Sequence, residues 1–337
     1  MLNISAYNAE LAYEETLWKV KINGIQESSA RGPVITVPFP TTLSITNPRD
    51  RVIFDPTRNC NPFFHVMEFI WMMHGGASAQ WITQFNSNLK KSTEADGRIH
   101  GAYGYRWRYH FDSDQILDVI QLLRREPHSR RAVISMWDPD EDLGTNHNDY
   151  PCNTHLYFRI VSGCLDMLVC NRSNDLFWGM LGANVVHMTM LQEVIADFVG
   201  IPIGTYRVVT NNLHVYTDMP GFKDIWGFDP KLGSIGEGQR IIKTVKDDTP
   251  ADDYESFVSD CDLFVNGDFE SITNRWLIGT AMPMHDAYLS RDWEFRRQVA
   301  STIQSPDWRK SCQEWLERKA SYATSTAPSP STTTERT

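Results

Sequence analysis

The sequence predicts an α+β fold, because segments with helical and with strand periodicity are mixed along its 337 residues. Two strand-like runs, 154–161 and 164–170, flank Ser162 and Gly163, a pair that is typical of a hairpin turn. Residues 185–199 then show the helical spacing of apolar side chains. Hydrophobic residues make up 41% of the chain, which is sufficient for a sizeable core.

The elements before the hairpin follow from local signals. Residues 9–23 predict an amphipathic helix that ends near Gly24, which we expect to adopt a left-handed stop conformation. β-Branched residues interrupted by prolines predict short strands within 33–54. The segment 61–76 predicts a largely buried helix that ends at its paired glycines.

Further elements complete the mixed pattern. Residues 114–125 predict a helix with Asp112 and Ser113 as candidate N-caps. The runs 132–137 and 205–212 predict two more strands.

The chain divides into three predicted parts. Residues 1–225 are expected to form the core, and residues 226–320 a C-terminal extension of the same domain, whose role the sequence does not indicate. Periodicity weakens from about Gly238 and becomes helical again over 291–320. The final segment, 321–337, is rich in Ser, Thr and Pro and is expected to be a disordered tail.

Charge and composition exclude several classes. A net charge of -10 argues against a protein that coats DNA or RNA, since neutralising phosphates requires excess Lys and Arg. A few arginines in one pocket can still hold a single phosphate. No long apolar run predicts a membrane span and no leader pattern predicts secretion, so we expect a cytoplasmic protein. The six cysteines lack metal-binding spacing, which predicts reduced thiols and no metal site.

Cys152 is a candidate nucleophile. It follows Pro151 directly before a predicted strand, and the strand that pairs with it leads to Arg172. Because a guanidinium near a thiol lowers the thiol pKa, this pair would activate the sulfur. A single cysteine is more often a small buried hydrophobe, so the pattern needs support from other motifs.

Other motifs have a simpler structural interpretation when each is taken alone. Arg130 and Arg131 stand at the start of a strand, where a solvated pair is common. The segment 101–108 combines Gly, Tyr and Arg, as an aromatic-walled loop or a packed turn would. His214 and Tyr216 share one strand face, where they could hold a sugar hydroxyl or pack in the core.

The order of these motifs is more specific than any one of them. A glutamate in a buried helix (HVMEFIWMMHGG) is followed by GAYGYRWR, SRR, PC, RSND and LHVY. In this order, over roughly residues 60–220, the chain resembles the thymidylate synthase and pyrimidine hydroxymethylase superfamily. The resemblance implies a mixed sheet packed by helices and a homodimer formed through the sheet.

The resemblance also implies one-carbon transfer from 5,10-methylenetetrahydrofolate to C5 of a pyrimidine nucleoside monophosphate. Cys152 would add to C6, since C5 becomes nucleophilic only after that addition. Glu68 would be the acid–base group, and its apolar helix would raise the carboxyl pKa. Tyr103 would manage water and the C5 proton.

Several basic residues match phosphate ligands of the superfamily. Arg172 and Ser173 match the ligands from the same chain. Arg130 and Arg131 match the paired arginines that reach the phosphate of the partner subunit, which implies a homodimer with shared sites. Arg31 is the candidate phosphate arginine of a mobile loop.

The resemblance assigns four more contacts. His214 and Tyr216 match the pair that holds the 3′-hydroxyl of the nucleotide. Asp175 and Trp71 are expected to contact the folate.

The base-reading position depends on an insertion. An amide can accept from N3–H and donate to O4 of uracil, whereas a carboxylate suits the amino group of cytosine. Counting from Gly179 reaches Ala183, and allowing one inserted residue reaches Asn184. We prefer Asn184, since alanine could read nothing, and this predicts dUMP as substrate.

The sequence favours 5-hydroxymethyl-dUMP as product. Synthases that resemble this chain shield the reacting carbon with tryptophans and a closing C-terminal segment. Here residues 84–101 contain no tryptophan, although Trp81 lies just before them, and the C-terminus is polar. An open site admits water. Asn153, where many synthases have histidine, points the same way. The alternatives are dTMP synthesis and hydroxymethylation of dCMP or CMP.

Two alternatives come from other classes. One is a cysteine hydrolase that pairs Cys152 with His155, although no third orienting group is evident. The other is a non-catalytic relative that binds nucleotides or RNA, which the set of catalytic residues and the acidic balance disfavour. We expect a pyrimidine nucleotide as ligand and no direct nucleic-acid or membrane partner.

Overall fold

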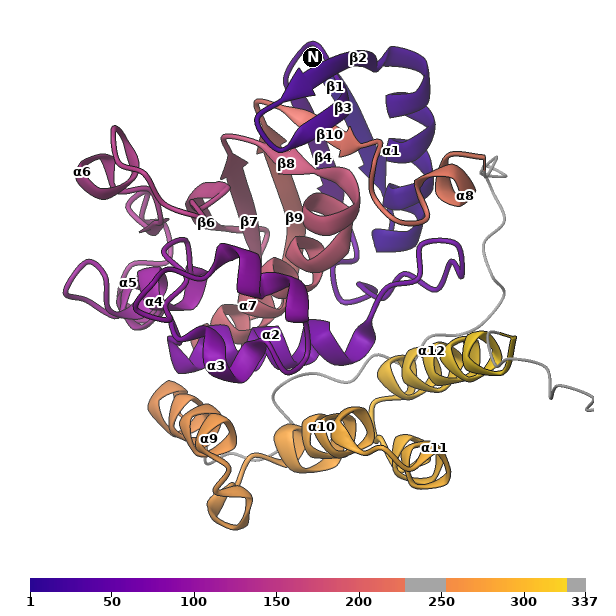
Figure 1. Ribbon diagram of the computed structural model, residues 1–337. Coiled ribbons are helices and arrows are strands. Elements are labelled where there is room, and N and C mark those ends of the chain that lie inside the picture. Colours follow the sequence, from indigo (N-terminus) through magenta and orange to yellow (C-terminus); the bar gives the residue numbers. More distant parts are fainter. Residues whose placement is uncertain (228–252, 326–337) are drawn as a thin grey trace, which may run out of the picture.

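The computed structural model describes residues 1–227 and 253–325 and confirms the α+β fold (Figure 1). A six-stranded sheet has the order β1-β4-β9-β7-β6-β5, and a four-stranded sheet has the order β2-β3-β10-β8. Each sheet contains parallel and antiparallel pairs, so the predicted mixed character is also confirmed. The strands are β1 (Leu2–Ala6), β2 (Ile25–Ser29), β3 (Gly32–Thr36), β4 (Thr41–Ile45), β5 (Val133–Ser135), β6 (Asn153–Val161), β7 (Cys164–Asn171), β8 (Asn174–Asp175), β9 (Ile203–Thr210) and β10 (Leu213–Tyr216).

Helices pack on one face of the larger sheet, beside its first strand, and on one another. The α-helices are α1 (Ala9–Asn23), α2 (Pro62–His74), α3 (Ala79–Ile82), α4 (Tyr103–Arg108), α5 (Gln115–Arg125), α6 (Pro139–Asp142), α7 (Asn184–Val199), α8 (Phe222–Gly227), α9 (Tyr254–Asn266), α10 (Met282–Leu289), α11 (Trp293–Ser301) and α12 (Pro306–Ser325). Short 3-10 or π-helical segments are η1 (Ser87–Ser92), η2 (Leu176–Ala183), η3 (Phe269–Ser271) and η4 (Leu277–Ala281).

The core lies between the larger sheet and a layer of helices. Helix α7 packs on β7 and β9, and α2 and α5 flank α7 (Figure 1). On β6, Leu156 and Phe158 point into this core, whereas Tyr157 and Val161 on the alternate face are 40% and 36% exposed. One face of the sheet is therefore left open in a single chain.

Local signals explain why two central elements form where predicted. Helix α2 begins after Asn61, whose side chain accepts from Phe64 N, and ends at Gly75 in the left-handed region (φ 77°). The β6–β7 hairpin turns at Ser162 (φ 51°) and Gly163 (φ 79°), the two positive φ values that a tight antiparallel turn requires.

Two helix-end predictions were wrong in detail. Gly24 has an extended backbone (φ -74°, ψ 143°) instead of the left-handed stop, and its place is explained by close packing, because a Cβ there would lie 2.4 Å from Ile35 Cγ2. The N-cap of α5 is Asp114, which accepts from two backbone N–H groups, and not Asp112 or Ser113. Asp112 instead takes a positive φ of 55° in the preceding turn.

The C-terminal helices form a second layer on α2 (Figure 1). Phe63 of α2 lies 5.5 Å from the ring of Trp315 in α12, and Trp81 lies 6.4 Å from Phe264 in α9. Helix α12 continues to Ser325, so the first residues of the predicted disordered tail are helical. The rest of that tail, and the weakly periodic region around Gly238, lie outside the described residues. None of the described helices is both long and apolar enough to cross a membrane.

Candidate active site

The β6–β7 hairpin brings Cys152 and Arg172 together, as predicted. The backbone N–H of Arg172 donates to Cys152 O at 3.0 Å, and its Nη2 lies 3.8 Å from Cys152 Sγ. The guanidinium also donates to the carbonyl oxygens of the two residues before the cysteine, at 2.9 and 3.2 Å. These bonds fix the cation beside the sulfur. His155, the alternative partner, stacks on Tyr157 instead.

Burial raises the pKa of the Cys152 thiol above its ordinary value, and the opposing effect of Arg172 is smaller. We expected the guanidinium to lower this pKa, but the cost of desolvating a thiolate outweighs the attraction. The thiol is therefore protonated in the unliganded protein at neutral pH, and its attack requires a proton acceptor.

Glu68 is the acidic residue of the otherwise apolar helix α2. Burial, with the nearby charge of Asp149, raises the pKa of the Glu68 carboxyl to about 8, as its apolar surroundings predicted. Its Oε2 lies 3.3 Å from His187 Nε2. That nitrogen donates to His65 O at 3.1 Å, and burial lowers the pKa of His187 to about 3, so the imidazole is neutral. Glu68 Oε2 is left without a hydrogen-bond partner among the described residues.

Tyr103 begins helix α4, which packs directly on α2. At Gly104 a Cβ would lie 2.1 Å from Met72 O, so only glycine permits this approach, which accounts for one glycine of the GAYGYRWR motif. Burial, followed by the charges of Cys152 and Asp149, raises the pKa of the Tyr103 hydroxyl. This hydroxyl therefore stays protonated near the nucleophile.

The ends of β8 and β10 form a hydrogen-bonded polar wall. Ser173 Oγ donates to Asn212 Oδ1 at 3.1 Å, and His214 Nδ1 lies 2.8 Å from the same oxygen. The rings of His214 and Tyr216 meet edge to face at 5.1 Å. Asn212 was not singled out from the sequence, although it directly precedes the LHVY motif. It joins the predicted phosphate residue Ser173 to the predicted sugar residue His214.

The segment before Asn184 is irregular. Element η2 is π-helical, and Leu181 and Gly182 leave helical geometry within it. A π-type bulge accommodates one extra residue in a helix and is frequent at functional sites. Asn184 then begins α7, and its Nδ2 lies 3.4 Å from Asn174 Oδ1, a side chain that comes from β8.

The two predicted folate residues lie in different surroundings. Asp175 accepts from the backbone of the following turn through Oδ1, whereas its buried Oδ2 has no hydrogen-bond partner among the described residues, and burial raises its pKa to about 6. Trp71 lies in the core, where its indole N–H donates to Ser78 O at 3.2 Å. Trp178, which follows Asp175 and is 51% exposed, presents an indole to solvent. The sequence analysis did not select Trp178.

The predicted arginines lie apart from one another. Arg31 is exposed beyond β2, donates to Asn148 O at 3.1 Å, and is near enough to oppose the rise in the Cys152 pKa. Arg130 and Arg131 are exposed before β5, and Arg131 pairs with Glu126 at 2.8 Å. In the described part of the chain, neither Arg130 nor Arg131 forms a hydrogen bond with Cys152.

Asp149 is a pocket residue that sequence reasoning missed. Its Oδ2 lies 2.4 Å from the point where a Cβ of Gly101 would stand. Its charge contributes to the raised pKa of Glu68, of Tyr103 and of Cys152, so the carboxylate lies near all three groups. A loop residue shows no periodicity, and only its position three residues before the cysteine could have indicated it. Among the described residues, no group of three His, Cys, Asp or Glu side chains is arranged to hold a metal ion.

Comparison with known proteins agrees with this arrangement. Residues 12–223 match the family model for thymidylate synthase. The chain belongs to the thymidylate synthase family. It is 34% identical, over 94% of both chains, to the deoxyuridylate hydroxymethyltransferase of Pseudomonas phage M6. The enzyme of that name from Bacillus phage SP01 is 33% identical over 57% of this chain and 53% of its own. The thymidylate synthase of T4 phage shares the fold, with a TM-score of 0.52 and 22% identity over 61% of this chain and 76% of its own.

Residues 84–101, which we expected to leave the reacting carbon unshielded, contain no tryptophan. The ring of Trp81 lies 4.9 Å from that of Phe85, at a tilted angle, and meets Phe264 of α9, so it belongs to the contact with the C-terminal helices. The following stretch instead brings Thr93 and Glu94 against Asn148, next to Asp149. The residues beside Asp149 at this point are therefore polar.

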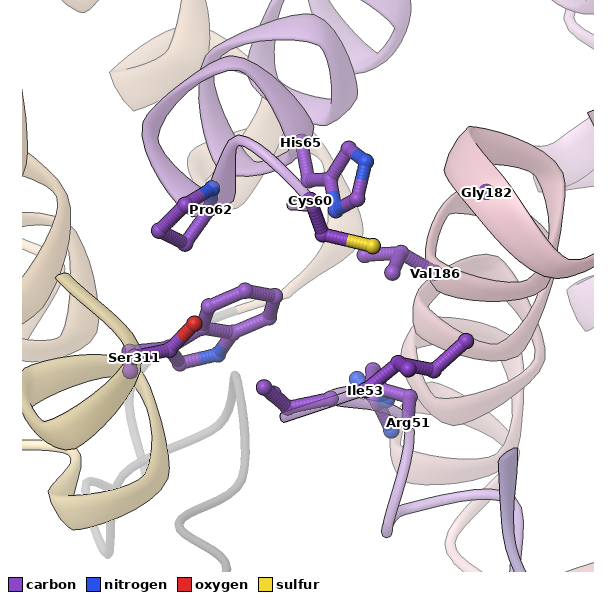
Figure 2. A pocket seen from close by; sticks show the side chains of 10 residues that line it. Arg51, Ile53, Cys60, Pro62, His65, Gly182, Val186 and Ser311 are labelled. Carbon is purple, nitrogen blue, oxygen red and sulfur yellow. The ribbon is translucent and has the colours of Figure 1, made fainter. Parts of the chain in front are cut away.

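Helix α12 borders a narrow cavity that is separate from this pocket (Figure 2). Cys60 and His65 line it from the start of α2, Ser311 from α12, and Gly182 and Val186 from η2 and α7. The cavity is thus lined both by α12 and by Gly182 of the segment between Asp175 and Asn184.

Proposed function

We propose that the chain hydroxymethylates dUMP at C5, with 5,10-methylenetetrahydrofolate as the one-carbon donor. The proposal rests on similarity to a deoxyuridylate hydroxymethyltransferase over 94% of the chain, joined to the pairing of Arg172 with Cys152 and to a charge on Asp149 that acts on both Glu68 and Tyr103. Formation of dTMP is the alternative within the family. Hydroxymethylation of dCMP or CMP is the second alternative.

The first covalent step belongs to Cys152. The thiol gives its proton to a water, and the sulfur forms a bond to C6 while the C5–C6 π electrons move towards O4, which makes C5 an enolate-like nucleophile. Arg172 Nη2, 3.8 Å from the sulfur, stabilises the thiolate as it forms.

Glu68 is proposed to donate a proton near O4. With a pKa of about 8 it is protonated at neutral pH, and its Oε2 makes no hydrogen bond within the described chain. The proton is therefore available to a water or a ligand. Tyr103, whose pKa is also raised by burial, keeps its proton and can orient a water beside the nucleophile.

The donor is proposed to bind beside Asp175 and Trp178. When bound, methylenetetrahydrofolate supplies the methylene carbon. The buried, unpaired Oδ2 of Asp175 fits a hydrogen-bond donor such as a pterin N–H, because an unmet acceptor costs free energy until it is paired. The half-exposed ring of Trp178 offers an aromatic surface next to it.

Asn184 is proposed to read uracil. Its amide lies near Asn174 Oδ1, which orients the NH₂ group and leaves the amide oxygen for N3–H. In an Asn184→Asp variant we expect kcat/KM to fall about 100-fold for dUMP and to rise for dCMP, because a carboxylate cannot donate to O4. Turnover of the two nucleotides would be measured side by side, and an unchanged preference for dUMP would contradict the assignment.

A homodimer through the open face of the larger sheet is proposed. Tyr157 and Val161 expose apolar surface there, which suits a second copy related by a two-fold axis. The exposed Arg130 and Arg131 would then be free to reach the phosphate bound by the partner chain.

Release of tritium from 5-tritiated dUMP tests the function. We expect release that depends on methylenetetrahydrofolate, a product with the mass of 5-hydroxymethyl-dUMP, and no accumulation of dihydrofolate. Dihydrofolate with dTMP would establish the synthase reaction instead, and release from 5-tritiated dCMP alone would establish the cytosine enzyme. No release from either base would contradict the enzyme assignment and favour a nucleotide-binding relative.

A further inference from the structure

The segment in front of the nucleophile fixes the backbone of Asp149. Asn148 N donates to Glu94 Oε1 at 2.7 Å, which ties the preceding residue to the neighbouring loop. His147 stacks on His100 with ring centroids 3.6 Å apart. A loop held in this way gives its next side chain a defined direction, in the manner that active-site residues require.

The side chain of Asp149 is directed at the pocket by a glycine. Its Oδ2 lies against Gly101, 2.4 Å from the position of an ideal Cβ, so any larger residue there would displace the carboxylate. Gly101 stands two residues before Tyr103, which places the carboxylate between the loop of the tyrosine and the loop of the nucleophile.

No ion pair neutralises Asp149 among the described residues, although charged groups surround it. Arg31, Arg172 and His100 favour its ionised form and oppose the burial that raises its pKa. Its charge also raises the pKa of Glu68, whose value of about 8 keeps that carboxyl protonated at neutral pH. Two carboxyl groups in one pocket with different surroundings are suited to act as an acid and a base.

The proposed hydroxymethylation has one step without an assigned residue, the addition of water. Resting on that proposed function, we propose that Asp149 accepts a proton from the water that attacks the methylene carbon attached to C5. The water oxygen forms a bond to this carbon, and the π electrons of the exocyclic double bond move towards O4. The C5–C6 double bond then re-forms as the bond between C6 and Cys152 Sγ breaks. The hydroxyl group comes from water, its other proton passes through Asp149 to solvent, and the cysteine leaves as a thiolate.

An Asp149→Asn variant of the full chain tests this role with 5-tritiated dUMP, methylenetetrahydrofolate and added 2-mercaptoethanol. Loss of the C5 proton precedes water addition, so we expect tritium release within about threefold of the wild type. The hydroxymethyl product should fall about 100-fold, because one proton acceptor is lost. The thiol should capture the methylene carbon instead and give a thioether product.

The matched control is Asp140→Asn, the same change at an exposed position of α6, which should leave both measurements unchanged. Asp149→Glu keeps a carboxylate and should return part of the hydroxymethyl product. An unchanged ratio of hydroxymethyl to thioether product in Asp149→Asn would overturn the proposal. Equal loss of tritium release and product would overturn it as well, since Asp149 would then act at the thiol step or in folding.

A ligand-free measurement separates this inference from the proposed function. Infrared titration of the carboxyl groups, with Glu68→Gln to assign the band, should show a lower Glu68 pKa in Asp149→Asn than in the wild type. An unchanged Glu68 pKa would contradict the placement of Asp149 whether or not dUMP is the substrate. Absence of tritium release from the wild type would contradict the function alone.

Discussion

The two sides of the candidate pocket differ in how their polar groups are satisfied. On the nucleotide side, Arg172, Ser173 and His214 are held by hydrogen bonds of 2.8–3.2 Å to neighbours at the strand ends. On the one-carbon side, Glu68 Oε2 has no hydrogen-bond partner among the described residues, and burial raises the pKa of both Glu68 and Tyr103.

The two sides are therefore suited to different tasks: the nucleotide side positions the ligand, and the one-carbon side transfers protons. A ligand is held best by donors and acceptors whose directions are already fixed, and the strand ends supply these. A group that must give or take a proton needs that proton uncommitted and a pKa near the working pH, which burial of Glu68 provides. Cys152 lies where the two sides meet.

The largest expected effect comes from removing the Cys152 thiol. Cys152→Ala should reduce tritium release at least about 10⁴-fold, because no other thiol occupies its place beside Arg172. Mass spectrometry of the denatured protein should also show no covalent nucleotide adduct. Cys164→Ala, at the hairpin turn, is the matched control and should behave as the wild type. Retention of activity within tenfold would contradict the role of Cys152.

The comparison predicts opposite kinetic signatures for its two sides. Glu68→Gln should lower kcat by about 10²–10⁴-fold with KM for dUMP nearly unchanged, since an amide cannot donate a carboxyl proton. Ser173→Ala should instead raise KM about tenfold with little change in kcat, because it removes a binding contact. Steady-state kinetics of both variants check this. Equal effects on KM and kcat in the two variants would remove the distinction between the sides.

The partner contribution to the nucleotide side can be tested by mixing variants. Arg130→Ala/Arg131→Ala should raise KM about 10–100-fold, since two charge-assisted phosphate contacts are lost. When it is refolded together with the inactive Cys152→Ala chain, activity should recover to about a quarter of the wild type, because half the dimers contain one complete site. Activity of the mixture that equals the sum of the separate variants would contradict the shared site.

Burial of Glu68 also predicts an effect on stability. Its folded pKa of about 8 lies above the unfolded value of 4.5, so the folded state holds the proton between these values while the unfolded state has lost it. The stabilisation is complete below about pH 4.5 and is lost as pH rises to about 8, amounting to roughly 5 kcal/mol. In thermal unfolding, the stability of the Glu68→Gln variant relative to the wild type should therefore increase from pH 5 to pH 8. A constant difference across this range would contradict the raised pKa.

The nucleotide side could be predicted from the sequence because it lies on regular elements. Alternation along the strands and the two-residue turn fixed the pairing of β6 with β7, and hence placed Arg172 beside Cys152. Glu68 was likewise recognisable as a carboxyl group inside an apolar helical pattern.

The remainder depends on irregular backbone. Asp149 reaches the pocket through a loop whose course is set by distant contacts with Glu94 and His100, which no local pattern encodes. Trp178 lies in η2, whose backbone leaves helical geometry at Leu181 and Gly182, and motif counting left the position of the base-reading residue in this region open. The sign of the Cys152 pKa shift was missed because the burial of a residue at a strand end is not visible in its neighbours in sequence.

The source of the new oxygen tests the account most directly. In a single turnover of dUMP and methylenetetrahydrofolate in oxygen-18 water, we expect 5-hydroxymethyl-dUMP that carries one oxygen-18 atom, together with tetrahydrofolate. Unlabelled dTMP together with dihydrofolate would contradict the account, because the reacting carbon would then have taken hydride instead of water.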